Sequence, residues 1–268
     1  MSQTEYDPLP AVVPALPRAV DWNRNLTFSM PFSWLAAGCR DLTHNPGSSL
    51  LFGVALFALS LVIVAGLFLT GYDYLLFPAL ASFLIVAPIF AIGLYEKSRL
   101  IERGEPATLG AMMVVRAESG GGQILFTGVL LSLVMLTWVR AAVLIYALFF
   151  GMVAFPGIEH ITTMLLTTPT GWAMLIVGTL VGGLFASFAF AISVFAIPML
   201  LDQKRDAFTA MGTSMTLVWN NLPVMLVWGS IVLGLLVLAL LPGMVGLIIV
   251  YPLLGHATWH AWRAVRRP

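Results

Sequence analysis

The feature that most restricts the fold of this chain is a set of long apolar stretches with almost no charge. Six stretches cover about residues 49–69, 75–94, 124–150, 172–201, 224–240 and 244–262. A helix of roughly 20 apolar residues can cross the hydrocarbon core of a bilayer. Only 9% of the 268 residues are charged and 60% are hydrophobic, so a soluble fold would have too little polar surface. The sequence therefore predicts an all-α polytopic membrane protein with six transmembrane helices.

Three shorter segments are predicted to be amphipathic helices that lie in the membrane interface, because they are too short or too polar to cross a bilayer. They cover about residues 28–42, 107–117 and 208–219. In the first, the apolar residues share one helical face, which consists of Phe32, Leu35, Ala36, Cys39 and Leu42. A break follows each segment, at residues 45–47, 120–122 and 220–223. Asparagine, proline and glycine at these positions are typical helix breakers.

The same order of elements occurs three times: interfacial helix, break, span, short turn, span. This order predicts three sequential helix-hairpin repeats at about residues 28–105, 106–205 and 206–265. Residues 1–25 are polar and rich in proline, so they are predicted to be a disordered or extended tail. Residues 26–268 are predicted to form a single membrane domain.

The positive charges predict the orientation in the membrane. Apart from Arg140, every lysine and arginine lies in the N-terminal segment, in charged loops predicted at residues 96–118 and 202–206, or at the C-terminus. The positive-inside rule therefore places the N- and C-termini in the cytoplasm. The polar loop predicted at residues 156–170 faces the other side. The net charge of +1 gives no global field for nucleic acid, and a single cysteine, Cys39, excludes an intrachain disulfide.

The ends of the second spans carry a family resemblance. They read Gly93-Leu94-Tyr95-Glu96, Pro198-Met199-Leu200-Leu201-Asp202, and Pro252-Leu253-Leu254-Gly255-His256-Ala257-Thr258-Trp259-His260. With Arg40-Asp41-Leu42 near the start of the chain, these residues resemble the DUF2189 family, a domain of unknown function. The resemblance covers nearly the whole chain after about residue 25. It implies a multi-pass protein of the bacterial inner membrane whose activity is unsettled.

His256 and His260 are candidate ligands for a metal ion or a haem, because a pair spaced four residues apart on one helix face can hold one ion. The alternative interpretation is structural. In that case the two histidines form part of an interfacial belt with Trp259 and Trp262 and stabilise contacts between helices.

A second candidate site is a polar cluster of Glu96, Asp202 and His44 at the cytoplasmic edge. Around a threefold axis relating the repeats, Glu96 and Asp202 would meet His260, and carboxylates with an imidazole could bind a cation or relay protons. The alternative is simple ion pairing of the two carboxylates with neighbouring arginines at the surface.

Arg140 lies within the third apolar stretch and is predicted to approach the outer interface. It either reaches the head groups alone or forms a charge pair with Asp73 or Glu159, the only acidic residues predicted on that side.

The sequence contains no phosphate-binding glycine loop, nucleophile elbow or zinc-protease motif, so an enzyme is not favoured. The leading hypothesis is an accessory subunit or assembly factor of a membrane complex, respiratory in kind, which would have protein partners in the lipid bilayer. The alternatives are a transporter or channel for a small solute or ion that uses the polar cluster, and a haem- or metal-binding membrane protein that uses His256 and His260.

Overall fold

The computed structural model describes residues 21–151 and 155–266, and over these residues the chain is all-helical. The helices are α1 (Met30–Thr43), α2 (Pro46–Leu69), the short 3₁₀ helix η1 (Asp73–Leu75), α3 (Leu76–Phe90), α4 (Ile92–Arg103), α5 (Leu109–Met113), α6 (Gly121–Phe150), α7 (Ile158–Thr167), α8 (Pro169–Ser193), α9 (Ala196–Asp202), α10 (Ala207–Asn220), α11 (Leu222–Leu240) and α12 (Leu247–Val265). The predicted tail covers residues 1–25, of which residues 1–20 lie outside the described part of the chain. Residues 21–25 lie against the start of α11, where the Arg24 amide donates a hydrogen bond to Asn221 Oδ1.

Five helical segments among the described residues are long and apolar enough to cross a membrane. They are Pro46–Leu69, Asp73–Arg103, Gly121–Phe150, Pro169–Asp202 and Leu222–Leu240. The prediction of an all-α membrane protein is confirmed in this form, but the sixth span is not. The predicted span at residues 244–262 became α12, whose second half carries polar side chains that are buried inside the protein.

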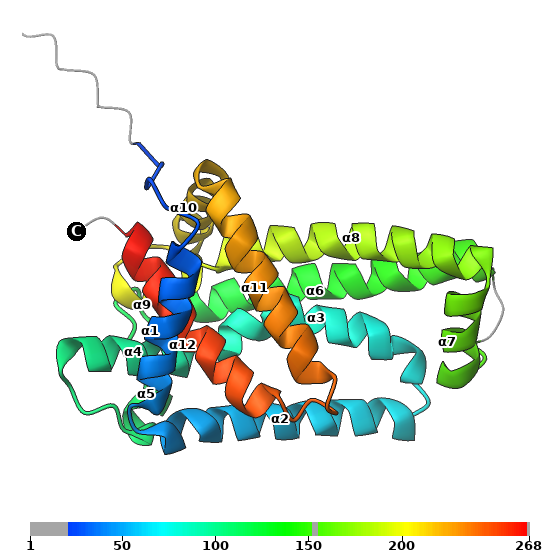
Figure 1. The fold of residues 1–268 in the computed structure, drawn as a ribbon, viewed down its shortest axis with the longest axis horizontal. Coiled ribbons are helices and arrows are strands. Elements are labelled where there is room, and N and C mark those ends of the chain that lie inside the picture. The colour runs from blue at the N-terminus through cyan, green and yellow to red at the C-terminus, as the bar shows by residue number, and fades with distance from the viewer. Residues whose placement is uncertain (1–20, 152–154, 267–268) are drawn as a thin grey trace, which may run out of the picture.

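The helices form two groups that meet at one end of the molecule (Figure 1). In the first group, α3, α6 and α8 run side by side and contact one another. In the second group, α12 packs against α1, α2 and α11. The short helices α4 and α9 join the groups, because both contact α12. We call this end, which consists of α4, α9 and the second half of α12, the polar end. The core is densest there and includes Trp259, Trp262, Phe195 and Leu200.

The order of elements along the chain agrees with the three predicted repeats, although the repeats themselves stay a prediction. Short helices α1, α5 and α10 occur in the three predicted interfacial segments, with α5 shorter than expected. Each is followed by a span and then by a second helix that reaches the polar end. On α1 the predicted interfacial face is exposed at Phe32, Ala36 and Cys39, while the opposite face packs on α12.

A side chain from α10 interrupts the helix that the sequence predicts as one continuous span at residues 172–201. The Ser214 hydroxyl donates to the Ala191 carbonyl (2.8 Å) and accepts from the Phe195 amide (3.1 Å). The hydroxyl thereby takes the place of the direct helical hydrogen bond from the Phe195 amide to the Ala191 carbonyl, four residues earlier in the chain. Pro198 also lacks the N–H that would reach the Val194 carbonyl. The result is the boundary between α8 and α9.

Two segments that were predicted as loops contain helices, so those predictions were wrong. In the charged loop at 96–118, α4 extends to Arg103, because no breaker occurs before Gly104, which ends the helix with a φ of 69°. In the polar loop at 156–170, the short helix α7 buries Ile161 and Leu165, and it packs against α8. Apolar residues four apart carried this signal.

A glycine allows α2 and α12 to pack with their backbones close together. At Gly53 an added Cβ would collide with the backbone of Ile248, including its carbonyl group. On the same helix Gly66 has no atom within 4 Å of that position. The two glycines therefore form a matched pair, of which only the first lies in a helix contact.

We expect Gly53→Ala to destabilise the protein and Gly66→Ala to leave it unchanged or slightly more stable. The added methyl at Gly53 must push α2 and α12 apart, and overpacking of this kind costs about 1–3 kcal/mol. At Gly66, replacing glycine within a helix gains up to about 1 kcal/mol. Thermal unfolding of both variants in mild detergent measures the difference, and equal melting temperatures would show that this close contact is absent.

Candidate functional site

The second half of α12 is almost fully enclosed and carries a buried polar side chain. His256 is fully buried, and Ala257, Trp259 and Ala261 are also buried. The neighbouring elements contribute buried polar groups of their own: Ser49 from α2, Lys97 and Ser98 from α4, and Asp41 from α1. Polar groups enclosed in this way need hydrogen-bond partners, because each unpaired group would cost about 1–3 kcal/mol.

These side chains form a continuous hydrogen-bonded chain. Lys97 Nζ donates to Ser49 Oγ (2.7 Å), and Ser49 Oγ lies 2.8 Å from His256 Nε2. On the other side of the ring, His256 Nδ1 lies 2.8 Å from Ser98 Oγ. The Ser98 side chain hydrogen-bonds to Asp41, whose Oδ2 lies 2.8 Å from His260 Nε2. We refer to Lys97, Ser49, His256, Ser98, Asp41 and His260 as the relay.

Lys97 and Asp41 constrain the directions of the hydrogen bonds that lie between them in the relay. A lysine ammonium can only donate, so Ser49 accepts from Lys97 and has its own hydrogen free for His256 Nε2. With that hydrogen directed to His256, Nε2 is the acceptor and the ring hydrogen lies on Nδ1, from which it is donated to Ser98. Ser98 in turn donates to the Asp41 carboxylate, which can only accept. His256 is therefore neutral and held in one tautomer, and the relay connects a buried cation to a buried anion.

The hydrogen bonds outweigh the effect of burial on Asp41. Burial raises the pKa of this carboxyl group, but hydrogen bonds with His260 and Ser98, together with the electrostatic interaction with His260, bring its pKa below the ordinary value of 3.8. Asp41 is thus charged at neutral pH, although it is largely enclosed.

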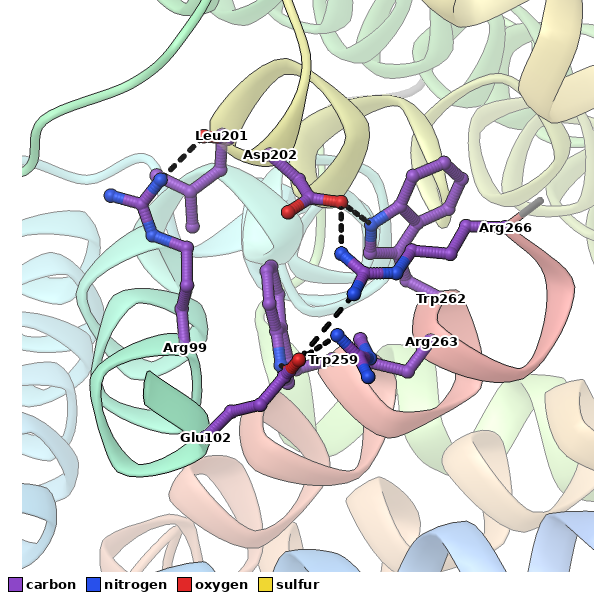
Figure 2. A network of polar contacts seen from close by, with 8 residues as sticks. All are labelled: Arg99, Glu102, Leu201, Asp202, Trp259, Trp262, Arg263 and Arg266. Carbon is purple, nitrogen blue, oxygen red and sulfur yellow. Dashed lines mark hydrogen bonds and ion pairs between the residues drawn. The ribbon is translucent and has the colours of Figure 1, made fainter. Parts of the chain in front are cut away.

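A second set of contacts lies beside the relay, between α4, α9 and α12, and we call it the arginine–carboxylate network (Figure 2). Glu96 forms an ion pair with Arg99 (2.7 Å). Arg99 also donates to the Leu201 carbonyl at the end of α9 (2.8 Å). Asp202 accepts from the indole of Trp262 (3.2 Å) and forms an ion pair with Arg266. Glu102 accepts from the indole of Trp259 (3.2 Å) and pairs with Arg263.

His256 and His260, which were predicted to hold one ion together, have separate hydrogen-bond partners. His256 has both ring nitrogens engaged with serines, whereas His260 pairs with Asp41. Within residues 21–151 and 155–266, no group of three histidine, cysteine, aspartate or glutamate side chains could hold a metal ion. Binding of a metal or a haem by His256 and His260 stays a prediction that would require these hydrogen bonds to break.

The other predicted site residues are dispersed. Where the structure describes the chain, no hydrogen bond or ion pair links Glu96, Asp202 and His44 to one another, and His44 is exposed. Glu96 pairs with its neighbour Arg99, but the pair is buried and not at the surface as the alternative interpretation had it, and the partner of Asp202 is Arg266 from the end of α12.

Arg140 is exposed on α6, and the described residues show no ion pair for it. Its pairing with Asp73 or Glu159 stays a prediction.

Sequence reasoning missed the relay residues Ser49, Lys97, Ser98 and Asp41. Lys97 and Ser98 were assigned to a loop, and Asp41 entered only through the family resemblance. One signal was available for the first two. Residues 94–103 contain no glycine or proline, so no helix breaker separates Lys97 and Ser98 from the end of the predicted span.

Comparison with protein families identifies one match. Residues 76–202 match the model of the family described as "Predicted integral membrane protein (DUF2189)". The predicted resemblance is thereby confirmed for the segment from α3 to α9, which holds Lys97, Ser98 and Arg99 but neither Asp41 nor His256. In comparisons with curated proteins and with solved structures, nothing matches this chain.

We expect the stability of the protein to fall in acid partly because of Asp41. Its folded-state pKa is lowered, so its carboxylate contributes stability above the ordinary value of 3.8, and this contribution disappears as the pH falls through the lower folded value. Asp41→Asn should cost about 1.5–3 kcal/mol at neutral pH, the range for hydrogen bonds to charged groups. It should also flatten the loss of stability below pH 3.8.

The measurement is the thermal unfolding midpoint in detergent, from neutral pH to below 3.8. Glu105→Gln serves as the control, because Glu105 is exposed and lies in the segment between α4 and α5. Parallel pH curves for the wild type and Asp41→Asn would contradict a charged Asp41 in the relay.

Proposed function

We propose that this integral membrane protein is an accessory subunit or assembly factor of a larger membrane complex, and that it holds partner spans against its own. The proposal rests mainly on α2. Only 11% of its most apolar window is buried, compared with 61% for the segment Pro169–Asp202. A span with so little contact inside its own chain offers most of its surface to lipid or to another protein.

The position of α2 relative to α3 supports this proposal. The two helices are joined only by the turn around η1, and short connections usually make neighbouring helices pack against each other. Here α2 contacts α12, α1 and η1, but it has almost no contact with α3. Figure 1 shows α2 at one edge of the molecule, separated from the group of α3, α6 and α8. A partner helix beside α2 would complete a packing layer that this chain leaves open.

The exposed side chains of α2 suit contact within a membrane. The C-terminal two-thirds of α2 carry exposed large aliphatic and aromatic side chains. These include Leu59, Leu61, Val62, Ile63, Phe68 and Leu69. None is charged, so these residues would meet either acyl chains or the apolar face of another span. Transmembrane helices associate largely through van der Waals packing, which surfaces of this type can provide.

The relay is better suited to hold helices together than to perform chemistry. A serine beside an imidazole and a lysine resembles an activated nucleophile. However, Ser49, Lys97 and His256 are all fully buried, so no substrate has access to them in this structure. The transport and metal-binding hypotheses receive less support for a related reason: Glu96, Asp202 and His256 are already engaged by other side chains.

We further propose that the polar end faces the cytoplasm of a bacterium and that the spans cross its inner membrane. The support is the distribution of lysine and arginine, which favours cytoplasmic loops. Among the described residues, Lys97, Arg99, Arg263 and Arg266 gather at the polar end, whereas α7 at the opposite end of the molecule contains none.

A photo-crosslinking residue at Val62 should capture one defined protein in intact cells. Val62 is 69% exposed on α2, and Leu136 on α6 is a matched control that is 54% exposed. We expect a discrete protein adduct from position 62 and only lipid adducts from position 136, as judged by mass spectrometry.

Three outcomes would contradict the accessory role. They are the same diffuse adducts from both positions, an adduct with lipid alone at position 62, or an adduct with a second copy of this chain.

Cysteine labelling tests the orientation. In a Cys39→Ala background, we expect an impermeant maleimide added to intact cells to label His160→Cys and not Glu105→Cys. Both positions are exposed in the structure, so protection of Glu105→Cys reports the membrane barrier. Permeabilised cells should label both variants, and the opposite pattern in intact cells would overturn the assignment.

A further inference from the structure

A large apolar cavity lies between α11 and the layer of α3, α6 and α8. Its volume is about 960 Å³, and it is partly open along one side. This volume is at the upper end of the range of roughly 300–1,000 Å³ that small-molecule sites occupy. The cavity exists because α11 packs on α12 and α1 and has little contact with α8.

The cavity is long and narrow. Along α8 its lining runs from Met174 to Ala191, which at ~1.5 Å per residue is about 25 Å. This length approaches the ~30 Å thickness of a bilayer's hydrocarbon core. Dividing the volume by the length gives a mean cross-section of about 40 Å² for the space open to small molecules. An extended hydrocarbon chain can lie along this space.

The chemistry of the lining agrees with such an occupant. No charged side chain is among the described lining residues, and apart from the ring groups of the aromatic residues only three polar side chains contribute, namely Thr179, Ser187 and Ser230. Tyrosines lie at the end near η1, where Tyr74 and Tyr146 contribute to the wall, and such amphipathic rings are typical of the membrane interface. Water does not fill an apolar cavity, and large cavities of this kind take up apolar molecules.

Glycines create part of the space. Gly178 and Gly183 both line the cavity on α8, and an added Cβ at either one would meet no atom within 4 Å. Larger side chains at these positions would occupy the cavity without displacing the backbone. On α11, Gly234 is equally open but is not part of the lining, so it provides a matched control.

We infer that this cavity binds an acyl chain of a bilayer phospholipid, which packs between α11 and α8 as a bound lipid. A phospholipid is the fitting source of the chain because the cavity is partly open and its described lining offers no charged group to recognise a polar ring or a free acid. The bound chain would fill the space between the two helix groups and set the distance between them. This inference is independent of the proposed accessory role, which concerns α2.

The test uses the full chain in vesicles of phosphatidylethanolamine and phosphatidylglycerol that contain a small fraction of phosphatidylcholine with a diazirine in one acyl chain. After irradiation, mass spectrometry of peptides locates the adducts. We expect adducts on Met174, Leu175 and other lining residues of α8. In the double variant Gly178→Leu/Gly183→Leu the yield on these residues should fall several-fold, while Gly234→Leu should retain the wild-type yield.

Further measurements distinguish a bound phospholipid chain from other occupants of the cavity. A polyisoprenoid probe with a diazirine should label the lining weakly, and strong labelling by it with none by the phospholipid would overturn the proposal. Equal labelling of the wild type and the double variant would show ordinary contact with bulk lipid only, and would also overturn it. If the double variant does not fold, Ser230→Leu narrows the cavity from the opposite wall on α11 and should lower the yield in the same way.

Discussion

The charged pair of Lys97 and Asp41 governs how the helices meet at the polar end. Neither side chain is free in water, and between them lie two serines and a neutral imidazole that link the charges by hydrogen bonds. The members come from four helices, so the charges are compensated only when α1, α2, α4 and α12 are all in place. Removing either charge breaks hydrogen bonds to a charged group, which contribute about 1.5–3 kcal/mol each. The relay therefore specifies one arrangement of these four helices and makes alternatives unfavourable.

The consequence of this arrangement reaches into the apolar half of the molecule. The arginine–carboxylate network adds α9 to the same assembly through Arg99, Asp202 and Arg266. With the helices joined at one end, not every pair of neighbouring spans packs along its length. They separate on one side between α2 and α3, and on the other side between α11 and α8. The first separation supports a protein partner, whereas the second has the dimensions of a lipid chain. In both cases the polar end positions surfaces that the chain itself leaves uncovered.

Much of this architecture followed from the sequence, because long apolar stretches and helix breakers act locally. The spans α2, α6 and α11 and the breaks after α1 and α10 occur close to where they were predicted. The misses have a shared physical origin in tertiary contacts. The boundary between α8 and α9 depends on Ser214, which comes from a different helix. Lys97 and Asp41 looked solvated because a charge in a sequence carries no sign of the partner that will enclose it. The His256–His260 spacing indicated a shared ligand, but helix geometry could not show that serines and Asp41 engage the two rings separately.

Buried ion pairs often stabilise a protein no more than well-packed apolar residues would, since desolvation offsets much of the attraction. For this chain, the alternative to the polar contacts is an α12 with apolar side chains throughout. An apolar α12 in place of the present one would be a sixth lipid-compatible span that could slide or rotate against α2. The present α12 has His256 held on both sides at 2.8 Å and its indoles donating to Glu102 and Asp202. Each contact has a required direction and length, so a shift of α12 by one residue would break all of them together. The polar groups thus determine the register of α12, and α12 in turn sets the positions of α2 and α11, which border the two openings.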